Sequence, residues 1–220
     1  MEDRSELIYE NYQKVKDRVL RAGGSQVSVV AVSKRIDVDV ISKVNKLGIV
    51  DFGENYPNEL LEKATVLSNS VLNWHMIGAI QSRRIPSLAG VVGVWHSVSR
   101  IKELELLAAN DSKSKLFLQV DYSKLQQRSG FAVSEVEQAL KKGLSLSLNV
   151  VGLMTITPVV SMPERIFIFR DLYQLGRSLD LSEFSMGMTD DFEAAVSEGS
   201  TIVRVGRAIF GDREIVQGKN

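Results

Sequence analysis

The chain has 220 residues, 44% of them hydrophobic and 25% charged, which suits one globular domain over residues 1–220 with a buried core. Lys plus Arg and Asp plus Glu both number 27, so the charge balance indicates neither nucleic acid nor an anionic membrane as a partner. The absence of cysteine excludes disulfides, thiolate metal sites and cysteine nucleophiles; with no apolar run near the roughly 20 residues of a membrane span, a cytoplasmic location is expected.

Short β-branched apolar runs alternate along the chain with amphipathic stretches. After a predicted N-terminal helix at 7–20, the candidate strands are 27–33, 49–52, 72–77, 91–97, 115–120, 148–153, 183–186 and 201–205. This pattern predicts an α/β fold, a single TIM-type (β/α)8 barrel with an extra N-terminal helix. A doubly wound open sheet has the same alternation and is the alternative fold.

Lys34 follows the apolar run VSVVAVS, where a buried strand gives way to its loop. In a barrel, the loops after the strands meet at one mouth, which carries the active-site groups. A partly shielded amine at that mouth can attack an aldehyde and form a Schiff base. The alternative is an ordinary surface lysine, because most lysines are exposed.

The last two strands are followed by loops with the features of a phosphate site. Ser185, Met186 and Gly187 follow the seventh strand, and Gly206 and Arg207 follow the eighth. Glycine lets backbone N–H groups approach an anion, although each glycine could equally serve a tight turn.

Arg204 lies within the last strand, and we expect it to face the barrel interior because an unpaired buried charge is costly. A guanidinium there could donate to a heterocycle nitrogen without giving up its proton. His75 and His96 are the only histidines, so an imidazole-rich metal site is not expected, and each could be a structural residue. Met154 and Met186 could likewise be core filling.

Several sequence blocks match one known family in order over almost the whole length. The blocks are AVSK at 31–34, FGENY at 52–56, WHMIGAIQ at 74–81, HSV at 96–98, GLMT at 152–155, SMGMTDDFEAAVSEGSTIVRVG at 185–206 and IFGDR at 209–213. The chain resembles the pyridoxal phosphate homeostasis protein family.

The resemblance implies a barrel like the N-terminal domain of alanine racemase, with pyridoxal 5′-phosphate (PLP) joined to Lys34 as a Schiff base. It also places Asn55 in the block that faces the cofactor. The full set of predicted cofactor contacts is Lys34, Asn55, His75, Met154, Ser185, Met186, Gly187, Arg204, Gly206 and Arg207, with no catalytic residue and no metal.

The implied function is that of a carrier or buffer in vitamin B6 homeostasis, a monomer with PLP and PLP-dependent apoenzymes as partners. Robust catalysis is not expected, because alanine racemases supply a tyrosine from a second domain and this chain ends after its eighth predicted strand. The alternatives are a racemase-like PLP enzyme, a Schiff-base aldolase-type barrel and a scaffold with a vestigial site. The chain departs from the family pattern at 35–37, at 121–122, at Arg207 and after 213. The changes at 35–37 and 121–122 could alter the rim of the pocket, while Arg207 could still bind phosphate through its backbone N–H.

Overall fold

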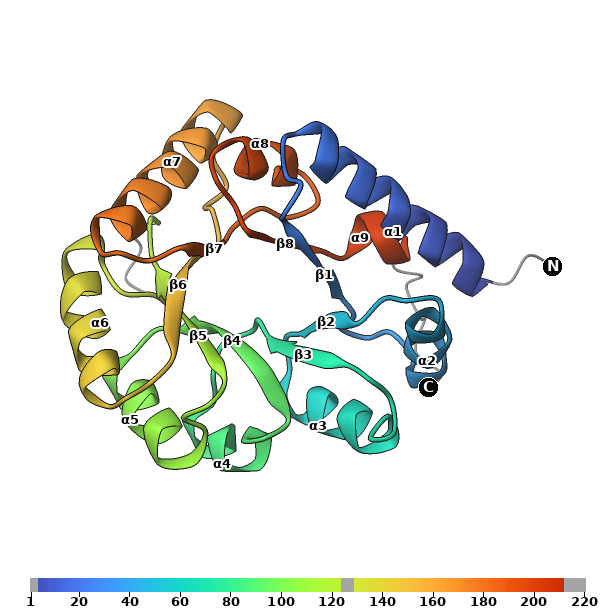
Figure 1. The fold of residues 1–220 in the computed structure, drawn as a ribbon, viewed down its shortest axis with the longest axis horizontal. Helices are drawn as coiled ribbons and strands as arrows, with labels where there is room; N and C mark the ends of the chain where they lie inside the picture. The colour runs from blue at the N-terminus through green and yellow to red at the C-terminus, as the bar shows by residue number, and fades with distance from the viewer. Residues whose placement is uncertain (1–3, 124–128, 212–220) are drawn as a thin grey trace, which may run out of the picture.

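The computed structural model describes residues 4–123 and 129–211. Its centre is a closed barrel of parallel strands in the order β1 to β8, with β8 paired to β1 (Figure 1). The strands are β1 Ser28–Val32, β2 Asp51–Glu54, β3 Asn73–Met76, β4 Val92–Val98, β5 Lys115–Val120, β6 Val150–Thr155, β7 Glu183–Ser185 and β8 Ile202–Val205. The predicted barrel is confirmed, and closure between β8 and β1 excludes the open sheet.

Helices surround the barrel, because each connection between parallel strands must cross back over the outside of the sheet. They are α1 Arg4–Arg21, α2 Val38–Lys46, α3 Pro57–Val66, α4 Ile85–Leu88, α5 Ile101–Asn110, α6 Val136–Ser145, α7 Met162–Ser178, α8 Phe192–Ser197 and α9 Arg207–Phe210. Short 3₁₀ turns at Ser82–Arg84 and Val133–Glu135 precede α4 and α6.

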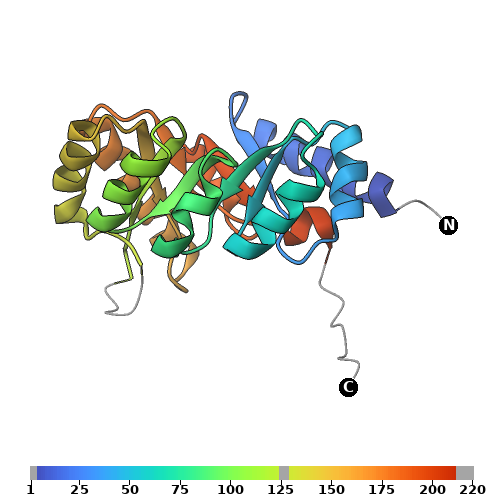
Figure 2. The ribbon, with the colours of Figure 1, turned by 90° about the horizontal axis from the view of Figure 1, so that it is seen from below.

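Helix α1 is the predicted extra N-terminal helix, and it covers the seam where the barrel closes. Its apolar face buries Ile8, Val15 and Val19 at spacings that suit a helix. In Figures 1 and 2 the blue α1 lies beside the red α9, and both helices are in contact. Arg18 forms a bidentate ion pair with Glu193 of α8, in which Nε and Nη2 donate to the two carboxylate oxygens at 3.0 and 2.8 Å. The first and last parts of the chain are therefore held together.

The main core lies between the strands and the helices, whereas a small apolar cluster fills part of the barrel interior. This interior cluster consists of Val30, Val94, Phe117, Met154 and Ile202. Polar side chains occupy the rest of the described interior, and they form the site described below.

No helix in the described parts of the chain has the length and apolar character needed to cross a bilayer. The same residues contain no group of three or more His, Asp or Glu side chains placed to hold a metal ion. Residues 212 and 213 of the predicted IFGDR block lie outside the described residues.

Candidate functional site

Lys34 lies at the C-terminal mouth of the barrel, directly after β1. Because β1 pairs with β8 in the register Val30 to Arg204 and Ala31 to Val205, the turn after β8 begins beside Val32, two residues before Lys34. Gly206 at that turn packs against Val32, whose carbonyl oxygen lies 3.4 Å from where a Cβ would be. The parallel strands therefore bring Lys34 together with Asn55 after β2 and with the loops after β7 and β8.

A buried lysine on α3 fixes the turn that presents Lys34. The ammonium group of Lys63 lies 2.7 Å from each of three acceptors: the carbonyl oxygen of Ser33, Oε1 of Glu54 and Oε1 of Glu59. The carboxylate of Glu59 also accepts a hydrogen bond from the backbone N–H of Arg35, which has a left-handed φ of 62°. We call Lys63, Glu54 and Glu59 the Lys63 cluster. It holds the backbone on both sides of Lys34, at Ser33 and Arg35.

Glu54 is the acid of this cluster and is fully buried. Burial raises the pKa of Glu54 above its ordinary value, while the charge of Lys63 and hydrogen bonds from Lys63 and Ser33 oppose that effect. The ion pair with Lys63 therefore offsets much of the cost of burying this carboxylate.

Asn55 carries a buried side-chain oxygen, Oδ1, that has no hydrogen-bond partner within the described residues. Its backbone is held close to β3 because Gly78 has no side chain, and a Cβ there would lie 2.0 Å from the carbonyl oxygen of Asn55. Since buried acceptors in proteins are normally satisfied, a free acceptor at this mouth indicates a place for a bound donor.

Arg204 points into the barrel and is only 4% exposed. Its Nη1 donates to Ser185 Oγ at 2.5 Å, and its Nη2 donates to the carbonyl oxygen of Thr155 at 2.8 Å. Burial lowers the pKa of Arg204 to about 10, against the opposing charge of Asp191, so the side chain stays a cation at neutral pH. A fixed cation therefore lies beneath the mouth at which Lys34 emerges.

The loops after β7 and β8 are shaped by glycine and tied to each other. Gly187 has φ of 92°, and a Cβ there would lie 2.7 Å from Ala195 Cβ, so this glycine lets the loop approach α8. Arg207 of the second loop donates to both carboxylate oxygens of Asp190 in the first, at 2.8 and 2.9 Å. The Arg207 side chain thus links the two loops, whereas its backbone forms the first residue of α9.

Comparison with known proteins identifies this barrel. Residues 4–214 match the family described as the alanine racemase N-terminal domain. A curated relative named pyridoxal phosphate homeostasis protein in Aquifex aeolicus is 32% identical over 96% of this chain and 98% of its own length. A relative of the same name in Pseudomonas aeruginosa is 36% identical over 94% of this chain and 96% of its own length. This chain belongs to the pyridoxal phosphate homeostasis protein family.

Solved structures agree with this membership. PipY of Synechococcus elongatus, solved with PLP bound, is 28% identical with a TM-score of 0.83, over 93% of this chain and all of that one. Alanine racemase from Corynebacterium glutamicum is 17% identical with a TM-score of 0.69, which is a likeness of fold.

Three of the predicted contacts lie in this family member away from the Lys34 turn. The side chain of Met154 belongs to the interior apolar cluster, whereas Met186 lies in the outer core. The backbone N–H and carbonyl of Met186 are bonded to Ile202 and Ser200. His75 lies near the opposite, N-terminal mouth.

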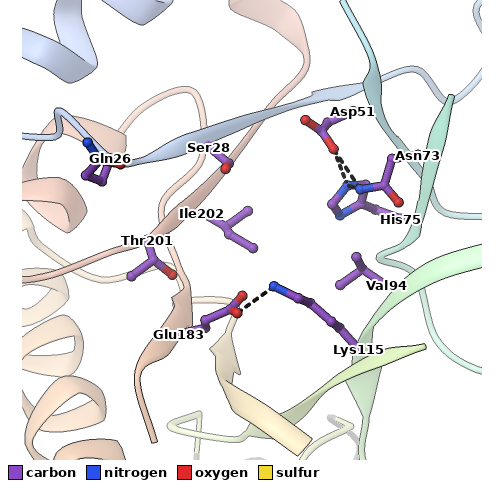
Figure 3. A pocket seen from close by; sticks show the side chains of 10 residues that line it. All are labelled: Gln26, Ser28, Asp51, Asn73, His75, Val94, Lys115, Glu183, Thr201 and Ile202. Carbon is purple, nitrogen blue, oxygen red and sulfur yellow. Dashed lines mark hydrogen bonds and ion pairs between the residues drawn. The ribbon is translucent and has the colours of Figure 1, made fainter. Parts of the chain in front are cut away.

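At that N-terminal mouth, a polar pocket of about 340 Å³ is lined by the first residues of several strands (Figure 3). His75 and Asn73 both approach Oδ1 of Asp51, at 3.0 and 2.8 Å. Across the pocket Lys115 pairs with Glu183 at 2.6 Å. His75 is predictable from the sequence, whereas Asp51 and the Lys63 cluster are not, because their partners lie on other strands and helices.

Proposed function

We propose that this chain binds PLP at the C-terminal mouth of the barrel, as a Schiff base on Lys34, and serves intracellular PLP homeostasis as a carrier. The observation that carries the proposal is the pair formed by Lys34 and Arg204. An amine at the end of β1 and a buried guanidinium on the adjacent β8 lie where an aldehyde and a pyridine nitrogen of one ligand would meet them.

The residues at the mouth fit this cofactor. The unpartnered Oδ1 of Asn55 offers an acceptor for a polar ring substituent. The glycine turns at Gly187 and Gly206 bring backbone N–H groups to the loops where barrels often hold phosphate. The side chain of Arg207 is held by Asp190, so we assign its contribution to its backbone N–H.

When bound, PLP supplies an aldehyde that condenses with an amine and a ring that withdraws electrons from it. Lys34 provides the amine. Arg204 would hold the ring nitrogen of bound PLP by donating a hydrogen bond to it, and that nitrogen would then stay unprotonated, which would weaken the electron withdrawal. Ser185 orients Arg204, with Met154 deeper in the interior and Met186 holding β7 to β8. His75 lies at the opposite mouth of the barrel, in the pocket lined by the first residues of the strands.

This arrangement favours storage over turnover. A weakly activating ring suits a protein that keeps PLP bound and passes it to PLP-dependent apoenzymes. The curated relatives are named pyridoxal phosphate homeostasis proteins. We propose that the chain does so as a monomer in the cytoplasm. The fold is shared with PLP-dependent racemases and decarboxylases, so slow side reactions with amino acids are part of the proposal.

The test is chemical trapping of the cofactor. Purified protein mixed with PLP should turn yellow, and borohydride reduction followed by peptide mass analysis should place a phosphopyridoxyl group on Lys34. Lys34→Ala should abolish that adduct, whereas Lys141→Ala, which removes an exposed lysine of α6, should leave it intact. A colourless protein that takes up no PLP, or an adduct on another lysine, would refute the proposal.

A further inference from the structure

Five side chains form a continuous hydrogen-bonded path through the barrel interior, and we call them the interior chain. Arg204 Nη1 lies 2.5 Å from Ser185 Oγ, which lies 2.7 Å from His96 Nδ1. His96 Nε2 lies 2.8 Å from His75 Nδ1, and His75 Nε2 lies 3.0 Å from Asp51 Oδ1. The path runs from Arg204, beneath the mouth that carries Lys34, to His75 and Asp51, which line the pocket at the opposite mouth (Figure 3).

The two ends of the interior chain favour one direction for the hydrogen bonds between them. The guanidinium of Arg204 can only donate, and an ionised Asp51 can only accept. Burial favours the neutral acid, but hydrogen bonds from His75 and Asn73 outweigh it and lower the pKa of Asp51 below its ordinary value. Asp51 is therefore a carboxylate at neutral pH.

Between these ends, each group accepts one hydrogen bond and donates one. Ser185 accepts from Arg204, so its own O–H is available for Nδ1 of His96. Burial in the barrel interior holds the pKa of His96 well below its ordinary value, so this ring is neutral. With Nδ1 accepting, His96 donates from Nε2 to His75, and His75 donates from its own Nε2 to Asp51.

The reverse direction is disfavoured at the Asp51 end. If His96 donated from Nδ1 to Ser185, His75 would have to donate from Nδ1. A lone pair on His75 Nε2 would then accept from Asn73 Nδ2 at 3.0 Å, but it would face the carboxylate of Asp51 at the same distance. The cation of Arg204 at the donor end and the anion of Asp51 at the acceptor end polarise all the intermediate bonds in the forward sense.

Packing holds the middle of the interior chain in place and keeps water away from it. The ring of His96 stacks on Phe117 at 4.9 Å between centroids and an angle of 13°. His96 and Ser185 are fully buried, and His75 is 3% exposed. The other charged groups that face this region, Lys115 and Glu183, pair with each other across the pocket.

We propose that Asp51, His75 and His96 are positioning residues that hold the Arg204 guanidinium in its orientation toward the cofactor from the far end of the barrel. Only the identity of the ligand rests on the proposed function, since the direction of the bonds follows from the protein alone. The pocket at the N-terminal mouth is then the anchoring end of the cofactor site.

The first test needs no ligand and no substitution. The chain has only two histidines, so ¹⁵N-histidine labelling followed by multiple-bond ¹H–¹⁵N spectra of the PLP-free protein at pH 7 reports on both rings of the path. Both rings should carry a proton on Nε2 and none on Nδ1. A proton on Nδ1 of either ring would overturn the proposal.

The second test breaks the anchor. Asp51→Ala should release the tautomer of His75 and raise the Kd for PLP about three- to tenfold, the usual effect of losing one hydrogen bond. Asp51→Asn keeps an acceptor oxygen and should recover most of that loss. Glu183→Gln, on the other wall of the same pocket, should bind PLP as the unaltered protein does.

The two proposals can fail separately. If Asp51→Ala retains the original tautomers and the original Kd, Asp51 is not a positioning residue. If the unaltered protein takes up no PLP at all, the proposed function fails, and the tautomers of the PLP-free protein still decide whether the interior chain exists as described.

Discussion

Lys34 and Lys63 lie near the same mouth of the barrel but have different roles. Lys34 is half-buried at the start of a loop, whereas Lys63 is only 4% exposed and has three acceptors for its three protons. The buried lysine thus acts on the backbone around Lys34. A rigid turn holds an amine in one position, which favours its reaction with a bound aldehyde.

The Lys63 cluster can be tested by removing its cation. Lys63→Met should lower the free energy of unfolding at pH 7 by about 3–5 kcal/mol, because the Glu54 carboxylate would be left buried and unpaired. Urea denaturation measures the loss. The matched control is Lys141→Met, which also breaks an i,i+4 pair with a glutamate, but on the surface, and should cost less than about 1 kcal/mol.

The pH dependence of that variant gives a second check. Burial already raises the pKa of Glu54, and without Lys63 it should rise further. A raised pKa in the folded state contributes stability at low pH that is lost as the pH rises through it. The deficit of Lys63→Met should therefore shrink as the pH is lowered from 7 toward 4.5, and a deficit that is constant with pH would contradict the role given to Glu54.

At the scale of elements, the sequence predicted every strand of the barrel, and the two-residue errors at the starts of β2 and β6 have one cause. Ile49 and Leu148 were assigned to strands, but their backbone N–H groups bond to Val44 and Gly143, so they close the preceding helices. Strands β2 and β6 consequently begin two residues later than predicted, at Asp51 and Val150. Apolar periodicity marks both kinds of buried residue in the same way.

The side-chain partnerships could not be predicted in the same way. Lys34, Arg204 and the glycine loops were found because barrel geometry places strand ends at one mouth. The interior chain instead joins five different strands, and residues as far apart as His96 and Ser185, 89 positions along the sequence, meet only after the barrel closes. No local spacing carries that information.

The loop between β7 and α8 gives a prediction about elements. Gly187→Ala should destabilise the protein by about 2–4 kcal/mol, because it combines a left-handed φ with a Cβ 2.9 Å from Phe192 Cα. Gly23→Ala is the matched control, since Gly23 has φ of 95° and open space around it, and it should cost only about 1 kcal/mol. Urea denaturation compares the two, and equal losses would show that packing against α8 is unimportant.

At the scale of the whole molecule, closure of the barrel places the proposed ligand contacts at both ends of the described chain. Lys34 and Asn55 follow β1 and β2, while Gly187 and Gly206 follow β7 and β8. Helix α1 adds a second connection by packing against α8 and α9 on the outside of the same seam. A ligand at this mouth bridges early and late strands, so its binding energy should oppose unfolding of the barrel as a unit.

This bridging predicts a thermal shift. At a PLP concentration 100 times the Kd, binding should stabilise the folded state by about 2.7 kcal/mol, which corresponds to a rise in Tm of about 5–10 °C for a domain of this size. Calorimetry of the protein with and without PLP measures it. At the same PLP concentration Lys34→Ala should show a smaller rise, because only the phosphate loops and Arg204 would hold the ligand, while Lys141→Ala should match the unaltered protein. If inorganic phosphate produced as large a rise as PLP, the loops alone would account for the stabilisation, and the bridge between Lys34 and the last strands would be wrong.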